Sequence, residues 1–120
     1  MKKCLIVDDV EVTRFSTSQF LKELGVESFA VSDSAQALAN LRQAKYDAIF
    51  LDWHIGKESG IDLLKQIRVE FGKSVPVVVC SGIEKQGAAP VAVNAGASAF
   101  LEKPTTKDKM SPCLKQLGIL

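Results

Sequence analysis

The sequence predicts a doubly wound α/β fold, in which a five-stranded parallel sheet carries helices on both faces. Five short apolar runs alternate with segments of helical length along the 120 residues. The runs are mostly continuous rather than alternating, which is typical of strands buried on both faces. The length suits one domain and is too short for two ordinary ones. Strands that alternate with helices form βαβ units with right-handed crossovers, and such units build this fold.

The five predicted strands are short and rich in Val, Ile, Leu and Phe. They cover residues 4–7, 29–31, 48–51, 75–80 and 99–101. The predicted helices between and after them cover residues 10–24, 34–44, 59–71, 88–95 and 106–117. Gly25 and Gly72 follow the first and third helices, where a glycine commonly ends a helix. Asp33 or Ser34 caps the start of the second helix.

The last two helices have weaker signals. Gly87 and Pro90 confine the fourth helix to a short segment. Pro112 interrupts the last helix, because proline removes a backbone hydrogen bond and clashes with the preceding turn. Either that helix kinks at Pro112, or Ser111 caps a shorter helix with Pro112 at its first position.

Composition excludes several classes of protein. Lys and Arg total 15 against 14 Asp and Glu, so the chain lacks the basic charge that nucleic acids or anionic membranes attract. No apolar run is long enough for a secretory signal or a spanning helix. Cys4, Cys80 and Cys113 have no C-x-x-C spacing, and the first two lie inside apolar runs, as buried free cysteines do. These features predict a reduced, cytoplasmic, single-domain protein.

Polar side chains follow four of the five predicted strands. Asp8 and Asp9 follow the first, Asp52 the third, Ser81 the fourth and Lys103 the fifth. The carboxyl ends of the strands are where ligands bind in this fold, so we expect these side chains to meet there. Clustered carboxylates repel one another unless they hold a hard cation, and Mg²⁺ suits carboxylate oxygens. A carboxylate beside such a metal, with an ammonium and a hydroxyl nearby, can attack a phosphoryl group and form an aspartyl phosphate.

Four segments carry a resemblance to a known family. They are LIVDD at 5–9, FLDWHIGKESG at 50–60, VVVCSG at 77–82 and AFLEKP at 99–104. In this order and spacing, the chain resembles a receiver domain of bacterial two-component response regulators over essentially its whole length. The resemblance implies a flavodoxin-like sheet with strand order 2-1-3-4-5.

The resemblance also implies roles for the acidic residues. Asp52 matches the phosphoacceptor. Asp9 would bind Mg²⁺ directly and Asp8 through water, with Asp52 and the backbone carbonyl of His54 completing the metal site. A zinc site at His54 is disfavoured, because no Cys or second His lies at zinc spacing.

Other positions match the family's switch. Ser81 stands where a Thr or Ser hydroxyl bonds a phosphoryl oxygen, and Lys103 matches the lysine that pairs with the phosphate. The family's bond corresponding to Lys103–Pro104 is cis. Phe100 stands where an aromatic side chain swings inward on phosphorylation, although plain core packing is the alternative.

Some residues depart from the family pattern. Ile55-Gly56 replaces the usual Met-Pro, and Val10 stands where a small polar residue is common. His54 and Ile83 match the two positions that flank the path of water to the acyl phosphate. Because Ile83 offers no hydrogen bond to that water, we expect slow self-dephosphorylation.

The implied function is a stand-alone receiver. It would accept a phosphoryl group from a phosphohistidine of a sensor histidine kinase or a histidine phosphotransfer protein, with no enzymatic activity beyond its own phosphorylation and dephosphorylation. Only 17 residues follow Lys103, so we expect output through a downstream protein and not through nucleic acid or a membrane. Phe15, off the apolar stripe of its helix, is either a kinase contact or an ordinary exposed side chain.

Four alternatives remain. A receiver fold could signal without phosphorylation, and the chain could be a fragment of a larger regulator. An aspartate-nucleophile phosphatase would need an acid where His54 stands. A nucleotide- or flavin-binding protein would need a glycine- or hydroxyl-rich loop at 10–12, where the sequence is Val-Glu-Val.

Overall fold

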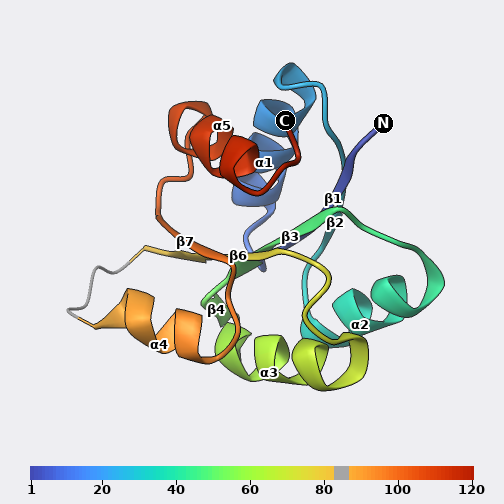
Figure 1. The fold of residues 1–120 in the computed structure, drawn as a ribbon, viewed down its shortest axis with the longest axis vertical. Coiled ribbons are helices and arrows are strands. Elements are labelled where there is room, and N and C mark those ends of the chain that lie inside the picture. The colour runs from blue at the N-terminus through green and yellow to red at the C-terminus, as the bar shows by residue number, and fades with distance from the viewer. Residues whose placement is uncertain (83–86) are drawn as a thin grey trace.

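The computed structural model of the protein, described for residues 1–82 and 87–120, contains the predicted parallel sheet (Figure 1). Its strand order is β2-β1-β3-β6-β7. This is the predicted order 2-1-3-4-5 when two short strands outside the sheet, β4 (His54–Ile55) and β5 (Glu58–Ser59), are left aside. The sheet strands are β1 (Lys3–Val7), β2 (Glu27–Val31), β3 (Ala48–Asp52), β6 (Val77–Ser81) and β7 (Ala99–Glu102). The predicted fold class and strand order are confirmed.

Helices cover both faces of the sheet. They are α1 (Glu11–Glu23), α2 (Ser34–Gln43), α3 (Gly60–Phe71), α4 (Ala88–Asn94) and α5 (Lys107–Gln116). Figure 1 shows α1 and α5 on one face and α2, α3 and α4 on the other. Each helix begins and ends within one residue of its predicted bounds, because the glycines and the Asp33 cap act as expected. Gly25 and Gly72 have φ of 80° and 75°, and the Asp33 carboxylate accepts from the backbone N–H of Gln36 at 2.8 Å.

Two apolar clusters separated by the sheet form the core. Leu5 and Val7 of β1 pack toward α2 and α3, whereas Cys4 and Ile6 pack toward α1 and α5. All four side chains are buried. Burial on both faces explains why the strand sequences are continuous apolar runs.

A two-stranded hairpin between β3 and α3 was not predicted. It consists of β4 (His54–Ile55) and β5 (Glu58–Ser59), which pair antiparallel around Gly56, whose φ is 62°. The Glu58 carboxylate accepts from the backbone N–H of Ser34 at 3.0 Å, so the hairpin is tied to the start of α2. Two-residue strands have no periodicity that a sequence pattern could reveal.

Helix α5 runs without interruption through Pro112. Of the two alternatives that the sequence left open, a short helix beginning at Pro112 is therefore wrong. The proline ring lies on the exposed side of the helix, and Met110, Cys113 and Leu114 face the core. Pro112 thus costs α5 one backbone hydrogen bond without disturbing the packing.

The three cysteines are free and buried, as the sequence predicts for two of them. Burial raises the pKa of the Cys4 thiol to about 12. Burial also raises the pKa of Cys80 and of Cys113. None of the three is a reactive thiolate at neutral pH.

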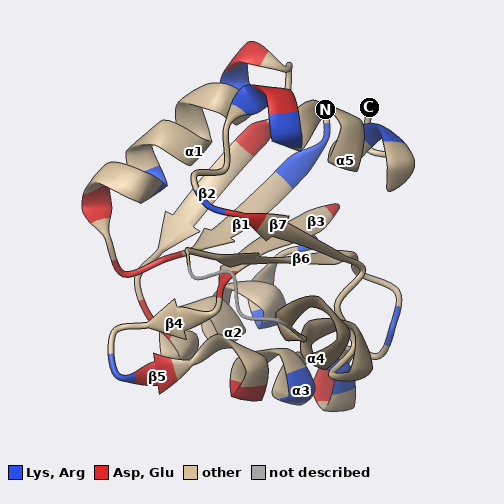
Figure 2. Ribbon diagram, turned by 90° about the vertical axis from the view of Figure 1, so that its left-hand side faces the viewer, with Lys and Arg blue, Asp and Glu red and all other residues tan. Residues whose placement is uncertain are grey.

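Residues of both charge signs occur along α1 and α3 (Figure 2), whereas α4 has none. None of the helices in residues 1–82 and 87–120 has the length and apolar character that crossing a membrane requires.

Candidate functional site

Three carboxylates meet at the carboxyl ends of β1 and β3, as the sequence predicts. Asp8 and Asp9 directly follow β1, and Asp52 is the last residue of β3. One carboxylate oxygen from each lies within 4.8 Å of the others. Asp8 and Asp52 are 4% and 8% exposed, whereas Asp9 is open to solvent. The cluster is therefore a buried pair of acids with a third acid at its mouth.

The backbone around Asp8 is held on two sides. Its N–H donates to the carbonyl of Val31 at 3.1 Å, and its carbonyl accepts from the Arg14 guanidinium at 2.7 Å. Its carboxylate accepts from the N–H of Val10 at 2.9 Å, which bends the chain toward α1. Arg14 is not among the predicted site residues, because nothing in the sequence pattern of α1 shows that its side chain contacts the backbone of Asp8.

Lys103 places its ammonium between the two buried carboxylates. Its Nζ donates to Asp8 Oδ2 at 3.1 Å and to Asp52 Oδ2 at 3.0 Å. Its own N–H donates to the carbonyl of Ser81 at 2.7 Å, which continues the pairing of β6 and β7 past the end of β7. The Lys103–Pro104 bond is cis, as the resemblance implies.

Burial and charge work against each other in this cluster. Burial raises the pKa of the Asp52 carboxyl, and the hydrogen bond and charge of Lys103 offset only part of that rise. Burial alone would lower the pKa of Lys103, but the hydrogen bonds and charges of Asp52 and Asp8 outweigh it and raise that pKa. Lys103 therefore stays an ammonium beside two acids that repel each other.

Ser81 and Phe100 lie on neighbouring strands. Ser81 is the buried last residue of β6, and Phe100 is a half-buried residue of β7. The Phe100 ring meets Trp53 edge to face, with ring centroids 6.3 Å apart and planes at 85°. Trp53 directly follows Asp52, so Phe100 contacts a neighbour of the buried acid. Ile83, the residue expected to slow dephosphorylation, lies outside the described residues.

Gly60 fits tightly behind Asp52. A Cβ at this position would overlap the backbone carbonyl of Asp52, and the N–H of Gly60 donates to the carbonyl of Trp53 at 2.7 Å. Only a residue without a side chain lets the first turn of α3 approach the end of β3 so closely. In the sequence, Gly60 is only the last residue of a motif, and no role is predicted for it there.

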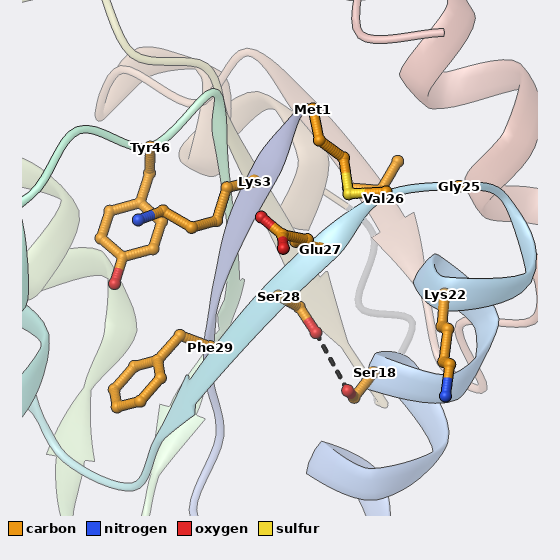
Figure 3. A pocket seen from close by; sticks show the side chains of 10 residues that line it. All are labelled: Met1, Lys3, Ser18, Lys22, Gly25, Val26, Glu27, Ser28, Phe29 and Tyr46. Atoms are coloured by element: carbon orange, nitrogen blue, oxygen red, sulfur yellow. Dashed lines mark hydrogen bonds between the residues drawn. The ribbon is translucent and has the colours of Figure 1, made fainter.

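Hollows of the described surface lie both beside Lys103 and away from these acids. One of about 500 Å³ runs along β2 at the amino ends of the strands (Figure 3). In it the Lys3 ammonium lies 4.7 Å from the centre of the Tyr46 ring, and the hydroxyls of Ser18 and Ser28 are 2.9 Å apart. No predicted site residue lines this hollow, so it has no part in the predicted chemistry.

A doubly wound sheet with three acids and a lysine at its carboxyl edge defines a class of protein, and the comparisons with known proteins agree on it. The family model of the response regulator receiver domain matches residues 4–115. The chain belongs to this family. Receiver domains accept a phosphoryl group in two-component signalling, and the family is a signalling module rather than a class of enzymes.

Two curated relatives are much longer than this chain. The chain is 32% identical to the sensory/regulatory protein RpfC of Xanthomonas campestris pv. campestris, covering 98% of this chain and 16% of RpfC. It is 27% identical to the transcriptional regulatory protein CrdR of Helicobacter pylori, covering 96% of this chain and 54% of CrdR. The activities and partners of those longer proteins are therefore not assigned to this chain.

Solved structures match the fold over nearly the whole chain. The CheY-like receiver domain from Methylobacillus flagellatus is 28% identical, with a TM-score of 0.88 and 98% of each chain covered. A response regulator from Thermotoga maritima is 26% identical, with a TM-score of 0.87, 98% of this chain covered and 97% of that one.

Proposed function

We propose that the protein accepts a phosphoryl group on Asp52 from the phosphohistidine of a kinase or phosphotransfer protein. The observation that carries the proposal is the Lys103 ammonium, which contacts both Asp8 and Asp52 inside the acidic cluster. An oxygen of the Asp52 carboxylate attacks phosphorus, and a P–O bond forms as the P–N bond to histidine breaks. The imidazole leaves with the electron pair of that bond and takes up a proton from solvent.

Lys103 and Ser81 act on the phosphoryl group in this proposal. The ammonium neutralises charge on the phosphoryl oxygens, since it already lies 3.0 Å from the acceptor carboxylate. The hydroxyl of Ser81, at the end of the strand beside β3, donates to another phosphoryl oxygen. Because Asp9 is exposed at the mouth of the cluster, the donor can approach Asp52 from that side.

The acidic cluster also fits a bound Mg²⁺. Its three carboxylates provide hard oxygen ligands within 4.8 Å of one another. In this proposal Asp9 would bind the ion directly and Asp8 through water, and Asp52 and the backbone carbonyl of His54 would complete the protein ligands. When bound, the ion supplies positive charge that stabilises the oxygens of the transferring group.

The two aspartates after β1 differ in their expected effect on Mg²⁺ affinity. Asp9→Ala should weaken binding more than Asp8→Ala, for which we expect a loss of about tenfold, as is typical when a ligand acts through an outer shell. Asp8 is already engaged by Lys103 and Val10, whereas Asp9 projects into solvent. Calorimetric titration with Mg²⁺ measures both affinities. Glu11→Ala is the control, because Glu11 is a nearby acid of α1 outside the cluster; equal, unchanged affinity in both aspartate variants would contradict the metal site.

Phe100 is proposed to transmit the change at Asp52. A shift of the Ser81 hydroxyl toward the phosphoryl group would vacate space that Phe100 fills. Full burial of a Phe side chain stabilises by about 1.5–3 kcal/mol, and about 1.4 kcal/mol shifts a two-state equilibrium tenfold. A partial change in burial therefore suffices to bias the domain.

The emission of Trp53, the single tryptophan, should report this movement. Its ring contacts Phe100, so phosphorylation of the wild type should change the emission. In Phe100→Ala, mass spectrometry should still show phosphorylation, but the emission change should be much smaller. Phe29→Ala is the matched control, since Phe29 is a 51% exposed phenylalanine on β2. An emission change of full size in Phe100→Ala would show that the signal leaves Asp52 by another path.

Output is proposed to occur through protein contacts. Helix α4 has no charged residue, and its Val91 and Val93 are 50% and 55% exposed. Val12 and Phe15 are 73% and 68% exposed on α1, the helix that begins two residues after Asp9, and are candidate contacts for the phosphodonor. The alternative, an interaction module that ignores phosphorylation, predicts that Asp52→Asn binds its partner as the phosphorylated wild type does.

A further inference from the structure

One side chain of α3 joins three segments of the chain far from Asp52. The Arg68 guanidinium donates from Nε to the carbonyl of Gly96 at 2.9 Å, and from Nη1 to the carbonyls of Val75 at 2.6 Å and Gly72 at 3.2 Å. Its Nη2 lies 3.4 Å from the hydroxyl of Ser98. Arg68 thus links the end of α3, the connection to β6 and the connection from α4 to β7.

The start of β7 lies against this link through Ser98. Among the described strands, β7 is an edge strand that pairs with β6 alone. Ser98, just before it, donates its backbone N–H to the carbonyl of Val77 at 2.8 Å, and its side-chain hydroxyl accepts from the N–H of Val77 at 3.0 Å. The other end of β7 runs into Lys103, which holds Asp8 and Asp52. A cationic side chain therefore holds this strand at each end, and only the one at the carboxyl end touches the phosphoacceptor.

Helix α4 is also held at its carboxyl end. It packs on the core through Ala92, its only buried side chain, and its first residue follows Gly87, where no side chain caps the helix. At its other end, Ala97 donates to the carbonyl of Ala92 at 3.0 Å, and Arg68 binds the carbonyl of Gly96. A Cβ at Gly96 would overlap the aliphatic stem of Arg68, so the guanidinium lies directly against this turn.

We propose that Arg68 is a positioning residue that fixes the end of α4 and the start of β7 to α3. As a result, a change at Asp52 moves the start of α4 near Ala88 and β7 from Phe100 onward, while the end of α4 and residues 97–98 stay in place. This inference rests on the proposed function for its second part. The anchoring itself exists without any phosphoryl group.

Amide hydrogen exchange of the unphosphorylated protein tests the anchor. In Arg68→Met, the amides of Ala97 and Ser98 should exchange about tenfold faster or more than in the wild type, because several hydrogen bonds that hold their turn are lost. The amide of Leu5 in β1, an interior strand of the sheet, reports global unfolding and corrects for any loss of stability. Arg42→Met is the matched control: it removes an exposed arginine that binds Glu70 at 2.7 Å, and it should leave Ala97 and Ser98 unchanged.

Unchanged exchange at Ala97 and Ser98 in Arg68→Met would overturn the anchor. If that variant does not fold, Arg68→Lys serves instead, because a lysine keeps the charge but has no planar fork to span several carbonyls. It should then give exchange faster than in the wild type at the same two amides, and wild-type rates would overturn the proposal.

A second measurement tests which residues change conformation when Asp52 carries a phosphoryl mimic. Beryllium fluoride with Mg²⁺, a mimic of an acyl phosphate, should shift the amide resonances of Ala88 and Phe100 in the wild type while those of Ala97 and Ser98 stay in place. In Arg68→Met the shifts should spread to Ala97 and Ser98. Equal shifts at all four amides in the wild type would overturn the proposal. The absence of any shift would contradict phosphorylation at Asp52, and the exchange rates would still decide whether Arg68 is an anchor.

Discussion

Incubation of the protein with Mg²⁺ and acetyl phosphate should add one phosphoryl group, and Asp52→Asn should abolish the addition. An amide is not a competent nucleophile toward phosphorus, whereas the carboxylate of Asp52 lies 3.0 Å from an ammonium that neutralises the incoming charge. Intact mass spectrometry measures the gain. Hydroxylamine should remove the group, because an acyl phosphate is labile to it and a phosphate ester is not.

A matched variant separates this result from a general effect of losing a carboxylate. Asp62 lies exposed in the first turn of α3, outside the acidic cluster, so Asp62→Asn should be phosphorylated as the wild type is. A phosphate on Ser81 or His54, or full phosphorylation of Asp52→Asn, would contradict the assignment of Asp52.

Gly60→Ala should give the largest loss of stability among single methyl additions near the site. The new Cβ would overlap the carbonyl of Asp52, which belongs to the backbone and cannot rotate away. Either the start of α3 or the end of β3 must move, and such overpacking costs about 1–3 kcal/mol, occasionally more. The hydrogen bond from Gly60 to the carbonyl of Trp53 would be strained as well. Urea denaturation measures the difference in the free energy of unfolding.

Gly82→Ala is the matched control for this loss. A Cβ at Gly82 would lie 3.8 Å from the flexible side chain of Lys103, which is an ordinary contact. Gly82 is also close to the acidic cluster, so both variants add one methyl group to the same edge of the sheet. A loss of stability in Gly82→Ala equal to that in Gly60→Ala would show that the close approach to Asp52 has no special weight.

The sequence predicts the fold and the gathering of Asp8, Asp9, Asp52 and Lys103, because both follow from local patterns and one general rule. Continuous apolar runs mark strands buried on both faces, and parallel strands bring their carboxyl ends to one edge. The polar residue after each run can therefore be assigned to that edge from its position in the sequence alone. The order of the strands does not follow from these patterns and depends on the resemblance to the family.

Contacts made across the sequence were not predictable in the same way. Arg14 binds the carbonyl of Asp8, and Arg68 binds carbonyls in two connections, yet each resembles any exposed arginine of an amphipathic helix. A guanidinium on a long side chain reaches several ångströms, so its partner depends on the packing of helices and not on spacing. The close approach of Gly60 to Asp52 could not be predicted for a similar reason, because the distance between α3 and β3 depends on how the two elements pack.

The buried cysteines leave the chain without a thiol that reagents in water can readily reach, although it contains three. Alkylating reagents attack the thiolate, and burial raises the pKa of all three thiols. A single cysteine introduced at an exposed position would then be the one preferred target in an otherwise unaltered chain. Val69→Cys on α3 and Val91→Cys on α4 are two such positions, with 89% and 50% of the original side chains exposed. Spin labels at this pair would allow the distance between the two helices to be followed in solution, with the native core left intact.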